Sequence, residues 1–311
     1  MYFDLQSHLF CWIFPIILIA GGSVCMEKSF LSPSENAVSF IETGFKKTSL
    51  TAAKEFALGI IAGAFIAFAA EGSNVAIHTI GSVGLAKALA GAIFTTGLMM
   101  VIIAGAELFT GNSLIVISCL KSKSRWLALL KNWFFVYTGN FVGSLLVVYF
   151  ILHSGQLGFS GNLLGGFTIK TAVYKTGLSF ENAFFMGILC NWLVCIAVWM
   201  ASTARDIAGK VLAIFFPIWL FIASGFEHSV ANMYYIPAGI LAKANEGFVQ
   251  AAISLGVKSD QIVNLNWGTL FTKNLIPVTL GNIVGGALFV ATIYWFVYLR
   301  DGKAKGDKSI A

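Results

Sequence analysis

Long apolar runs separated by short polar connections constrain this chain more than any other feature of its sequence. Hydrophobic residues make up 58% of its 311 residues and charged residues only 11%, whereas a soluble domain carries about 25% charged residues. A transmembrane helix needs roughly 20 apolar residues. We therefore predict an all-α integral membrane protein with six transmembrane helices, at residues 54–78, 86–119, 126–153, 180–203, 208–242 and 271–299.

The predicted organisation has four parts. Residues 1–25 hold a short apolar run without the preceding basic residues of a secretory signal. We interpret them as an atypical extension from an upstream or misassigned start, with a re-entrant or signal-like segment as the alternative. Residues 26–53 contain the helix-start signal Ser-Pro-Ser-Glu and predict a helix on the membrane surface. Residues 54–299 form the six-span domain and residues 300–311 a cytoplasmic tail.

The distribution of Lys and Arg predicts the orientation. If the N-terminal tail lies inside, 14 of the 20 Lys and Arg fall in inside segments and 6 in outside segments. Because cytoplasmic loops are enriched in positive charge, both termini are expected in the cytoplasm and the protein in the cytoplasmic (inner) membrane. The net charge of +6 therefore indicates topology and not nucleic-acid binding. The five Cys lack metal-ligand spacing, so we expect no metal and no cofactor.

The two halves of the sequence match each other. Three pairs of segments recur in the same order: FxxG at 56–59 and 184–187, GAELFTGN at 105–112 with GFEHSVAN at 225–232, and KNWFFVYTGNFVG at 131–143 with KNLIPVTLGNIVG at 273–285. Each half contains three spans, so the second half enters the membrane from the opposite side. This predicts an inverted 3+3 repeat with broken second and fifth helices, where such folds place their substrate path.

Glycines and ionisable residues in these segments have different interpretations. Close helix packing explains a set of span glycines, namely Gly139, Gly143, Gly281, Gly285 and Gly286. It does not explain Glu107, Glu227 and His228, because ionisable side chains inside a membrane are costly and usually functional.

The two breaks differ in the side chains that suit an anion. His228 can donate a hydrogen bond or a proton near physiological pH, and Thr110 in the other break offers a hydroxyl. Together they are expected to hold one small oxyanion. A carboxylate in the lumen would repel an anion, so Glu107 and Glu227 are expected outside it, bonded to backbone freed by the breaks. Three asparagines are expected to support the breaks in the same way, namely Asn112, Asn232 and Asn191.

Four motifs resemble those of the formate/nitrite transporter family: AGAELFTGN, NWLVCIAVWMA at 191–201, GFEHSVANMYYIPAG and NLIPVTLGNIVGG. The resemblance covers roughly residues 30–300. It implies an aquaporin-like protomer of six spans, a homopentamer with one pore per protomer, and a central His228 with Thr110 opposite.

The same resemblance implies hydrophobic constrictions on both sides of this pair. They map to Phe94, Leu98, Leu108 and Phe221, with Phe109 as a contributor and Asn191 beside the path. For Phe94 and Leu98, an ordinary packed helix face is the alternative.

The resemblance also implies two vestibule lysines. They map to Lys47, and to Lys175 in the loop before the fourth span. Their charge is expected to raise the anion concentration at the two mouths.

A bare anion inside a bilayer costs several kcal/mol or more. We expect the anion to receive a proton near His228 and cross as the neutral acid, or a protonated His228 to pair transiently with it. Both versions predict pH-dependent transport.

The motifs resemble the formate branch, so we rank formate before nitrite and hydrosulfide. A remote alternative is an intramembrane hydrolase using His228 with Ser229 or Ser113, although a Ser–His pair needs direct contact.

Overall fold

The computed structural model describes residues 28–301, so the predicted extension 1–25 and most of the predicted tail 300–311 lie outside the described residues. Six helices in the described part are long and apolar enough to cross a membrane. They are α2 (Ala52–Ile77), α3 (Val83–Ala104), α5 (Trp126–His153), α7 (Phe180–Thr203), α8 (Ile207–Ser224) and the helix Trp267–Tyr298. These helices match the six predicted spans to within a few residues, except that the second and fifth runs are each divided. The all-α, six-span prediction is therefore confirmed.

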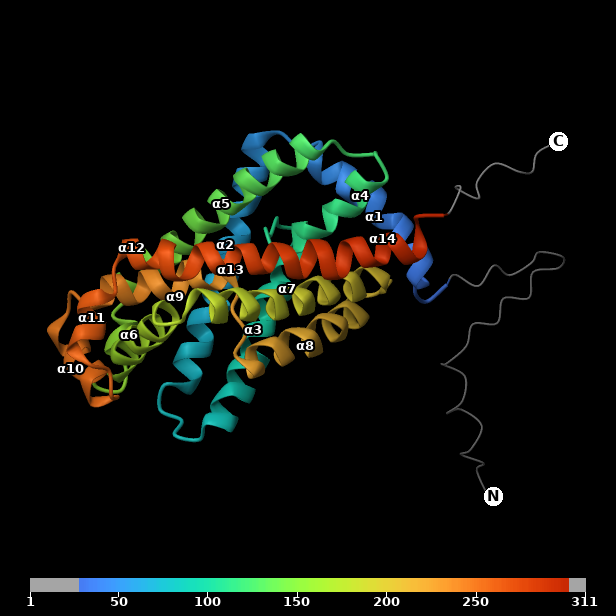
Figure 1. The fold of residues 1–311 in the computed structure, drawn as a ribbon. Helices are drawn as coiled ribbons and strands as arrows, with labels where there is room; N and C mark the ends of the chain where they lie inside the picture. The colour runs from blue at the N-terminus through green and yellow to red at the C-terminus, as the bar shows by residue number, and fades with distance from the viewer. Residues whose placement is uncertain (1–27, 302–311) are drawn as a thin grey trace, which may run out of the picture.

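The sixth span is a single helix with irregular segments. It runs through α12 (Trp267–Thr269), η3 (Leu270–Leu275), α13 (Ile276–Ile283), η4 (Val284–Thr292) and α14 (Ile293–Tyr298), where η3 and η4 are π-helical. It lies beside α7, which in turn lies beside α8 (Figure 1).

Both predicted interruptions are present, and each begins at a glycine. α3 ends at Gly105, whose φ is +85°, and the chain continues as η1 (Gly111–Ile115) and α4 (Val116–Leu120). α8 ends at Gly225, whose φ is +75°, and the chain continues as α9 (Ser229–Ala242). Glycine adopts this left-handed conformation without the steric cost of a Cβ, which is why it ends helices so often.

The shorter helices lie at the two ends of the bundle (Figure 1). α1 (Pro33–Thr48), α4 and α14 mark one end, called the α1 end below. α6 (Leu163–Thr176), α10 (Glu246–Ser254) and α11 (Ser259–Asn264) mark the other, called the α6 end, and η2 (Gln156–Gly158) precedes α6. The predicted loop position of Lys175 is wrong, because Lys175 lies in the last turn of α6. At 14 residues, α6 is too short to register as a span.

α1 is held against the spans by polar and aromatic contacts. A capping box between Ser32 and Glu35 begins the helix. The side chain of Asn36 donates to the carbonyl oxygen of Trp199 at 3.0 Å, and the ring of Phe40 stacks on that of Trp199 with centroids 5.0 Å apart. The helix predicted on the membrane surface is therefore α1, and it contacts the end of α7.

Glycines bring helix backbones together in the same way in both halves. A Cβ added to Gly59 of α2 would lie 3.1 Å from the Cα of Gly139 of α5. A Cβ added to Gly187 of α7 would lie 3.2 Å from the Cα of Gly281 of α13. The packing interpretation of the span glycines agrees with these contacts. Small residues thus set the distance between the first and third spans of each half.

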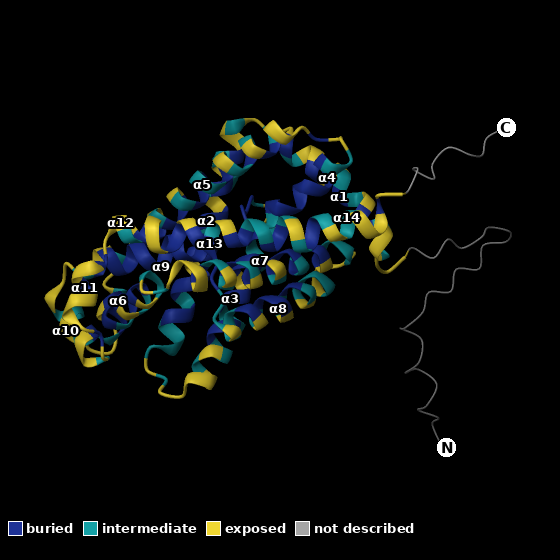
Figure 2. Cartoon of the chain, in the orientation of Figure 1, coloured by how far each residue is buried: buried dark blue, intermediate teal, exposed yellow. Residues whose placement is uncertain are grey.

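The outer faces of the spans are apolar and exposed. Figure 2 shows buried positions between the helices and exposed positions on the outside of the bundle. Leu127 and Phe134 of α5 are 72% and 62% exposed. A membrane protein needs no polar coat on these faces, because lipid tails are as apolar as the side chains.

The close contact of α2 with α5 makes Gly63 sensitive to substitution. Its added Cβ would meet the backbone oxygen of Asn140, which cannot move aside. We expect Gly63→Ala to destabilise the protein by about 1–3 kcal/mol through overpacking, seen as a lower melting temperature in detergent. The control is Gly72→Ala on the same helix, whose Cβ would lie 3.4 Å from Ile93 Cγ2. Equal melting temperatures for the two variants would contradict this account.

Candidate functional site

The two helix breaks meet in the interior through Thr110 and His228. Thr110 precedes η1, and His228 is the N-cap residue of α9. Thr110 Oγ1 lies 2.9 Å from His228 Nε2, and both side chains are buried. The sequence placed these residues in opposite breaks; the structure brings them into direct hydrogen-bonding contact.

The cap geometry of α9 selects the tautomer of His228. The backbone N–H of Ala231 donates to Nδ1 at 3.1 Å. Because a neutral imidazole has one donor and one acceptor nitrogen, the proton is assigned to Nε2, which faces Thr110. Thr110 Oγ1 then accepts this hydrogen bond, and its own proton is available to another acceptor.

The backbone of the first break is satisfied by Asn140 of α5. Its Oδ1 accepts from the N–H of Phe109 at 3.0 Å. Its Nδ2 donates to the carbonyl oxygens of Gly59 and Glu107 at 2.8 and 3.0 Å. One amide therefore joins α2, α5 and the break.

Asn282 of α13 repeats this arrangement in the second half. Its Oδ1 accepts from the N–H of Ser229 at 2.9 Å, and its Nδ2 donates to the carbonyl oxygens of Gly187 and Glu227 at 2.8 and 3.0 Å. Asn140 and Asn282 were not among the residues predicted to support the breaks. The Gly-Asn pair shared by the matched third spans was the available signal.

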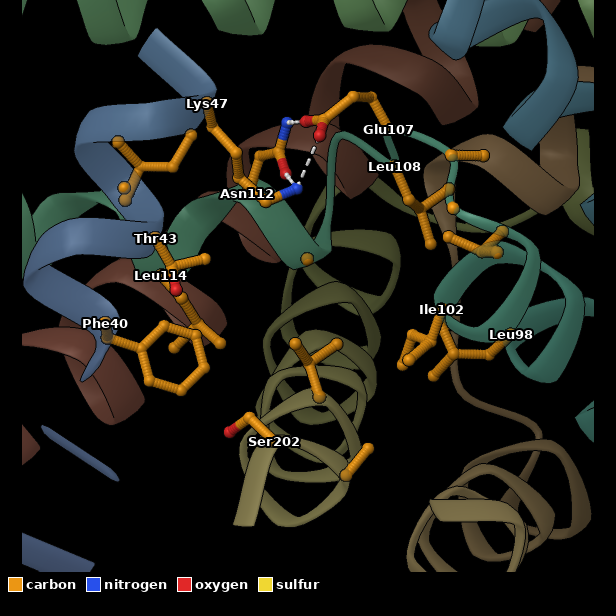
Figure 3. Close-up of a pocket in the computed structure, with 18 of the residues that line it drawn as sticks. Phe40, Thr43, Lys47, Leu98, Ile102, Glu107, Leu108, Asn112, Leu114 and Ser202 are labelled. Carbon is orange, nitrogen blue, oxygen red and sulfur yellow. Dashed lines mark hydrogen bonds and ion pairs between the residues drawn. The ribbon is translucent and has the colours of Figure 1, made fainter. Parts of the chain in front are cut away.

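Glu107 differs from the expectation that it bonds freed backbone. Its Oε1 lies 2.7 Å from Lys47 Nζ, and its Oε2 accepts from Asn112 Nδ2 at 2.7 Å. Lys47 also donates to Asn112 Oδ1 at 3.1 Å, and Figure 3 shows this cluster at one end of a cavity. Asn132 of α5 accepts a further bond from Asn112 at 2.8 Å. Because Asn140 already satisfies the break, the carboxylate of Glu107 is left to bind Lys47.

Glu227 forms the same cluster at the α6 end. Lys175 Nζ lies 2.8 Å from its Oε1, and Asn232 donates to its Oε2 at 2.6 Å. Asn274 donates to the same oxygen at 3.2 Å, and Lys175 lies 5.1 Å from the centroid of the Tyr235 ring. Asn132 and Asn274 were also missed, although both follow a lysine in the matched third spans.

Two cavities lie along the line from Lys47 to His228. The larger one, about 460 Å³, opens at the α1 end, with Phe40 on one side and Leu98, Ile102 and Leu108 on the other (Figure 3). The smaller one, about 10 Å³, is lined by Ile66, Phe94, Leu98, Leu108, Val194, Ile218, Phe221 and His228. Leu98 and Leu108 line both cavities, so they form the wall between them. The smaller cavity has room for about one water molecule.

The predicted constriction residues divide into two groups. Phe94, Leu98, Leu108 and Phe221 line the smaller cavity with His228, and the rings of Phe94 and Phe221 meet edge to face at 5.7 Å. Phe109 instead lies against Tyr137 and Trp133, with ring centroids 4.8 and 5.8 Å away.

Asn191, expected beside the path, lines neither of these two cavities. Its Nδ2 donates to the carbonyl oxygen of Asn282 at 2.6 Å and to that of Thr110 at 3.2 Å. Asn191 therefore links the first break to the last span, which agrees with the supporting role also predicted for it.

The contacts of His228 do not form a Ser–His pair. Its two ring nitrogens face Thr110 and the Ala231 N–H, and Ser229 Oγ has no hydrogen-bond partner among residues 28–301. Within the same residues, no cluster of three or more His, Cys, Asp or Glu side chains could hold a metal ion.

We expect Asn140→Ala to destabilise the protein by about 1–3 kcal/mol, because it leaves buried backbone groups without partners. Asn74→Ala is the matched control, since Asn74 is equally buried but its Nδ2 has no partner in the described residues. Thermal unfolding in detergent measures both. The bracing role of Asn140 would be wrong if the control lost as much stability.

We expect Lys175→Met to cost about 3 kcal/mol, because it leaves the buried carboxylate of Glu227 unpaired. The double variant Lys175→Met/Glu227→Gln should regain a large part of this loss. Lys47→Met is the comparison, and it should cost less because Lys47 is 29% exposed and Lys175 only 12%. A double-mutant cycle in thermal unfolding measures the coupling, and additive losses would argue against it.

Comparison of this sequence with known proteins shows its family. The family profile described as formate/nitrite transporter matches residues 34–296. A probable formate transporter of Methanothermobacter thermautotrophicus is 38% identical over 294 residues, which cover 89% of this chain and 100% of that protein. The formate channel FocA of Escherichia coli K12 is 38% identical over 275 residues, covering 87% and 95% of the two chains.

Solved structures agree with these sequence relatives. A pentameric formate channel with formate bound is 38% identical with a TM-score of 0.70, and the match covers 80% of this chain and 98% of that one. An FNT family ion channel is 27% identical with a TM-score of 0.70, covering 85% and 99%. These relatives are channels and transporters and not enzymes, so the comparisons do not favour the hydrolase alternative. The chain belongs to the formate/nitrite transporter family.

Proposed function

We propose that this protein carries formate across the membrane along the line from Lys47 through Leu98 and Leu108 to the Thr110–His228 pair. The observation that carries the proposal is the buried 2.9 Å contact between Thr110 and His228, flanked by apolar side chains. A small oxyanion fits two adjacent hydrogen-bond donors. Formate is the substrate named for several relatives of similar length, which supports it over nitrite and hydrosulfide.

The assigned tautomer of His228 supports one of the two mechanisms. With its proton on Nε2, the imidazole donates toward Thr110 and toward an anion that displaces the threonine. A second proton on Nδ1 would face the Ala231 N–H and break the N-cap bond of α9. We therefore favour His228 as a neutral hydrogen-bond donor that keeps its own proton. The anion takes up a proton from solvent, through water, and crosses the apolar wall as formic acid.

The wall of Leu98 and Leu108 requires such a step. An unpaired anion in an apolar surround costs several kcal/mol or more, whereas the neutral acid loses only its hydrogen bonds to water. Transport is then faster at lower pH, because formic acid forms more readily there.

The assembly and orientation follow the same proposal. Both termini then lie on the cytoplasmic side of the inner membrane, and so does the α1 end. The 14 to 6 distribution of Lys and Arg supports this orientation. In a homopentamer, the assembly described for the solved formate channel, the exposed apolar faces of the spans would contact lipid and the neighbouring copies of the chain.

The test is formate flux into liposomes between pH 5 and pH 7, with nitrite and hydrosulfide as competing substrates. We expect wild-type flux to rise as the pH falls. His228→Asn removes the Nε2–H donor at this position and should lower the flux at least tenfold. Ser229→Ala is the control and should transport normally, because its hydroxyl has no partner among the described residues. An unchanged rate in His228→Asn would overturn the mechanism.

A further inference from the structure

Among residues 28–301, those that line the cavity at the α1 end carry a net positive charge that does not come from Lys47. The charged residues that line it are Lys47, Glu107 and Lys210. The ammonium of Lys47 is 2.7 Å from the carboxylate of Glu107, so this pair contributes almost no net charge. Lys210, in the first turn of α8, forms no ion pair with any residue in 28–301. The remaining charge of the wall is therefore that of Lys210.

A second lysine lies near the start of the corresponding helix in the other half. Lys87, in the second turn of α3, is exposed and has no ion pair among the described residues. A Cβ added to Gly225 would lie only 2.5 Å from Lys87 Nζ. The ammonium of Lys87 therefore adjoins the second helix break, while the nearby Lys175 is neutralised by Glu227.

The two lysines lie on corresponding helices of the repeat, Lys87 at 18 residues before Gly105 and Lys210 at 15 residues before Gly225. α3 and α8 lie against each other, and each is the helix that precedes a break. Lys210 near the start of α8 shares a cavity with Gly105 at the end of α3, and Lys87 near the start of α3 adjoins Gly225 at the end of α8. Each half thus places one unpaired ammonium beside the break of the other half.

We propose that Lys210 and Lys87 collect the anion at the two mouths of the path, while Lys47 and Lys175 serve mainly as partners of buried glutamates. The inference rests on the proposed transport of formate and names the charges that concentrate it. A cavity of about 460 Å³ is roughly 10 Å across, about one Debye length at 0.1 M salt. One unpaired charge therefore acts on an anion anywhere inside it.

A structural role makes a different prediction. A cation near the C-terminal end of a helix interacts favourably with the helix dipole. In a purely structural role, Lys87 and Lys210 would stabilise the two helix ends at the breaks without affecting the anion. Such a role changes the melting temperature. It leaves the salt dependence of transport unchanged.

The first measurement is formate flux in liposomes at formate concentrations far below saturation, in 10 mM and 300 mM salt. We expect Lys210→Gln and Lys87→Gln to lower the flux at low salt by roughly fivefold, the effect of one charge a few ångströms away in water. The reduction should largely disappear at high salt and at saturating formate. Lys210→Arg and Lys87→Arg keep the charge and should transport like the wild type.

Matched controls come from lysines at the same ends. Lys46→Gln changes an exposed residue of α1 that does not line the cavity, and Lys273→Gln changes an exposed residue of η3. Both should leave low-salt flux unchanged. If the controls lose as much flux as Lys210→Gln and Lys87→Gln, general surface charge explains the effect and the proposal fails.

The second measurement does not depend on transport. Thr43→Cys places a thiol in the cavity near Lys210, and Ser224→Cys places one beside Gly225 near Lys87; both positions are exposed. The ratio of labelling rates for anionic and cationic methanethiosulfonates reports the local potential. We expect Lys210→Gln to lower this ratio for the Thr43→Cys thiol by at least about threefold. We expect Lys87→Gln to lower it for the Ser224→Cys thiol by a similar factor.

The two measurements separate the possible failures. A wild type that moves no formate overturns the proposed function, and the labelling ratios still decide the role of the lysines. Normal formate flux with unchanged salt dependence and labelling ratios in both Gln variants overturns this inference alone.

Discussion

The structure depends on how its backbone is satisfied where two helices stop inside the membrane. No water is available there to bond an exposed N–H or C=O, so irregular backbone is tolerated only when protein groups replace it. Asn140 and Asn282 supply these groups, each with one acceptor and two donor contacts to a break and to a neighbouring helix. The close approach allowed by Gly59 and Gly187 brings the helix carbonyls within reach of the two amides.

Because Asn140 and Asn282 bond the backbone of the breaks, the other polar side chains of the breaks make different contacts. The carboxylates of Glu107 and Glu227 bind lysines and asparagine amides. His228 serves as the N-cap of α9 through Nδ1 and thereby directs Nε2 at Thr110. One imidazole therefore caps α9 through Nδ1 and presents an N–H donor through Nε2.

Charge and apolar surface are arranged in sequence along the path. Ion pairs and unpaired lysines lie toward the ends, and Leu98 and Leu108 separate the cavity at the α1 end from the small space next to His228. An ion is stabilised at the ends and destabilised at the wall. Because the ends are charged and the wall is apolar, the proposed transport needs the anion to be neutralised by a proton. It does not need the wall to open widely.

The sequence by itself determined the six spans, the two breaks and the pairing of the halves, because these follow from hydropathy and from repeated Gly, Glu and Asn spacings that are local in the chain. It also singled out Thr110 and His228, which are two of the three polar residues at which the matched breaks differ; Ser229 is the third. Only the tertiary structure decided which side chains satisfy which groups. Lys47 with Glu107, Asn140 with Phe109, and Lys87 beside Gly225 are contacts between distant segments, and their choice depends on distances set by helix packing.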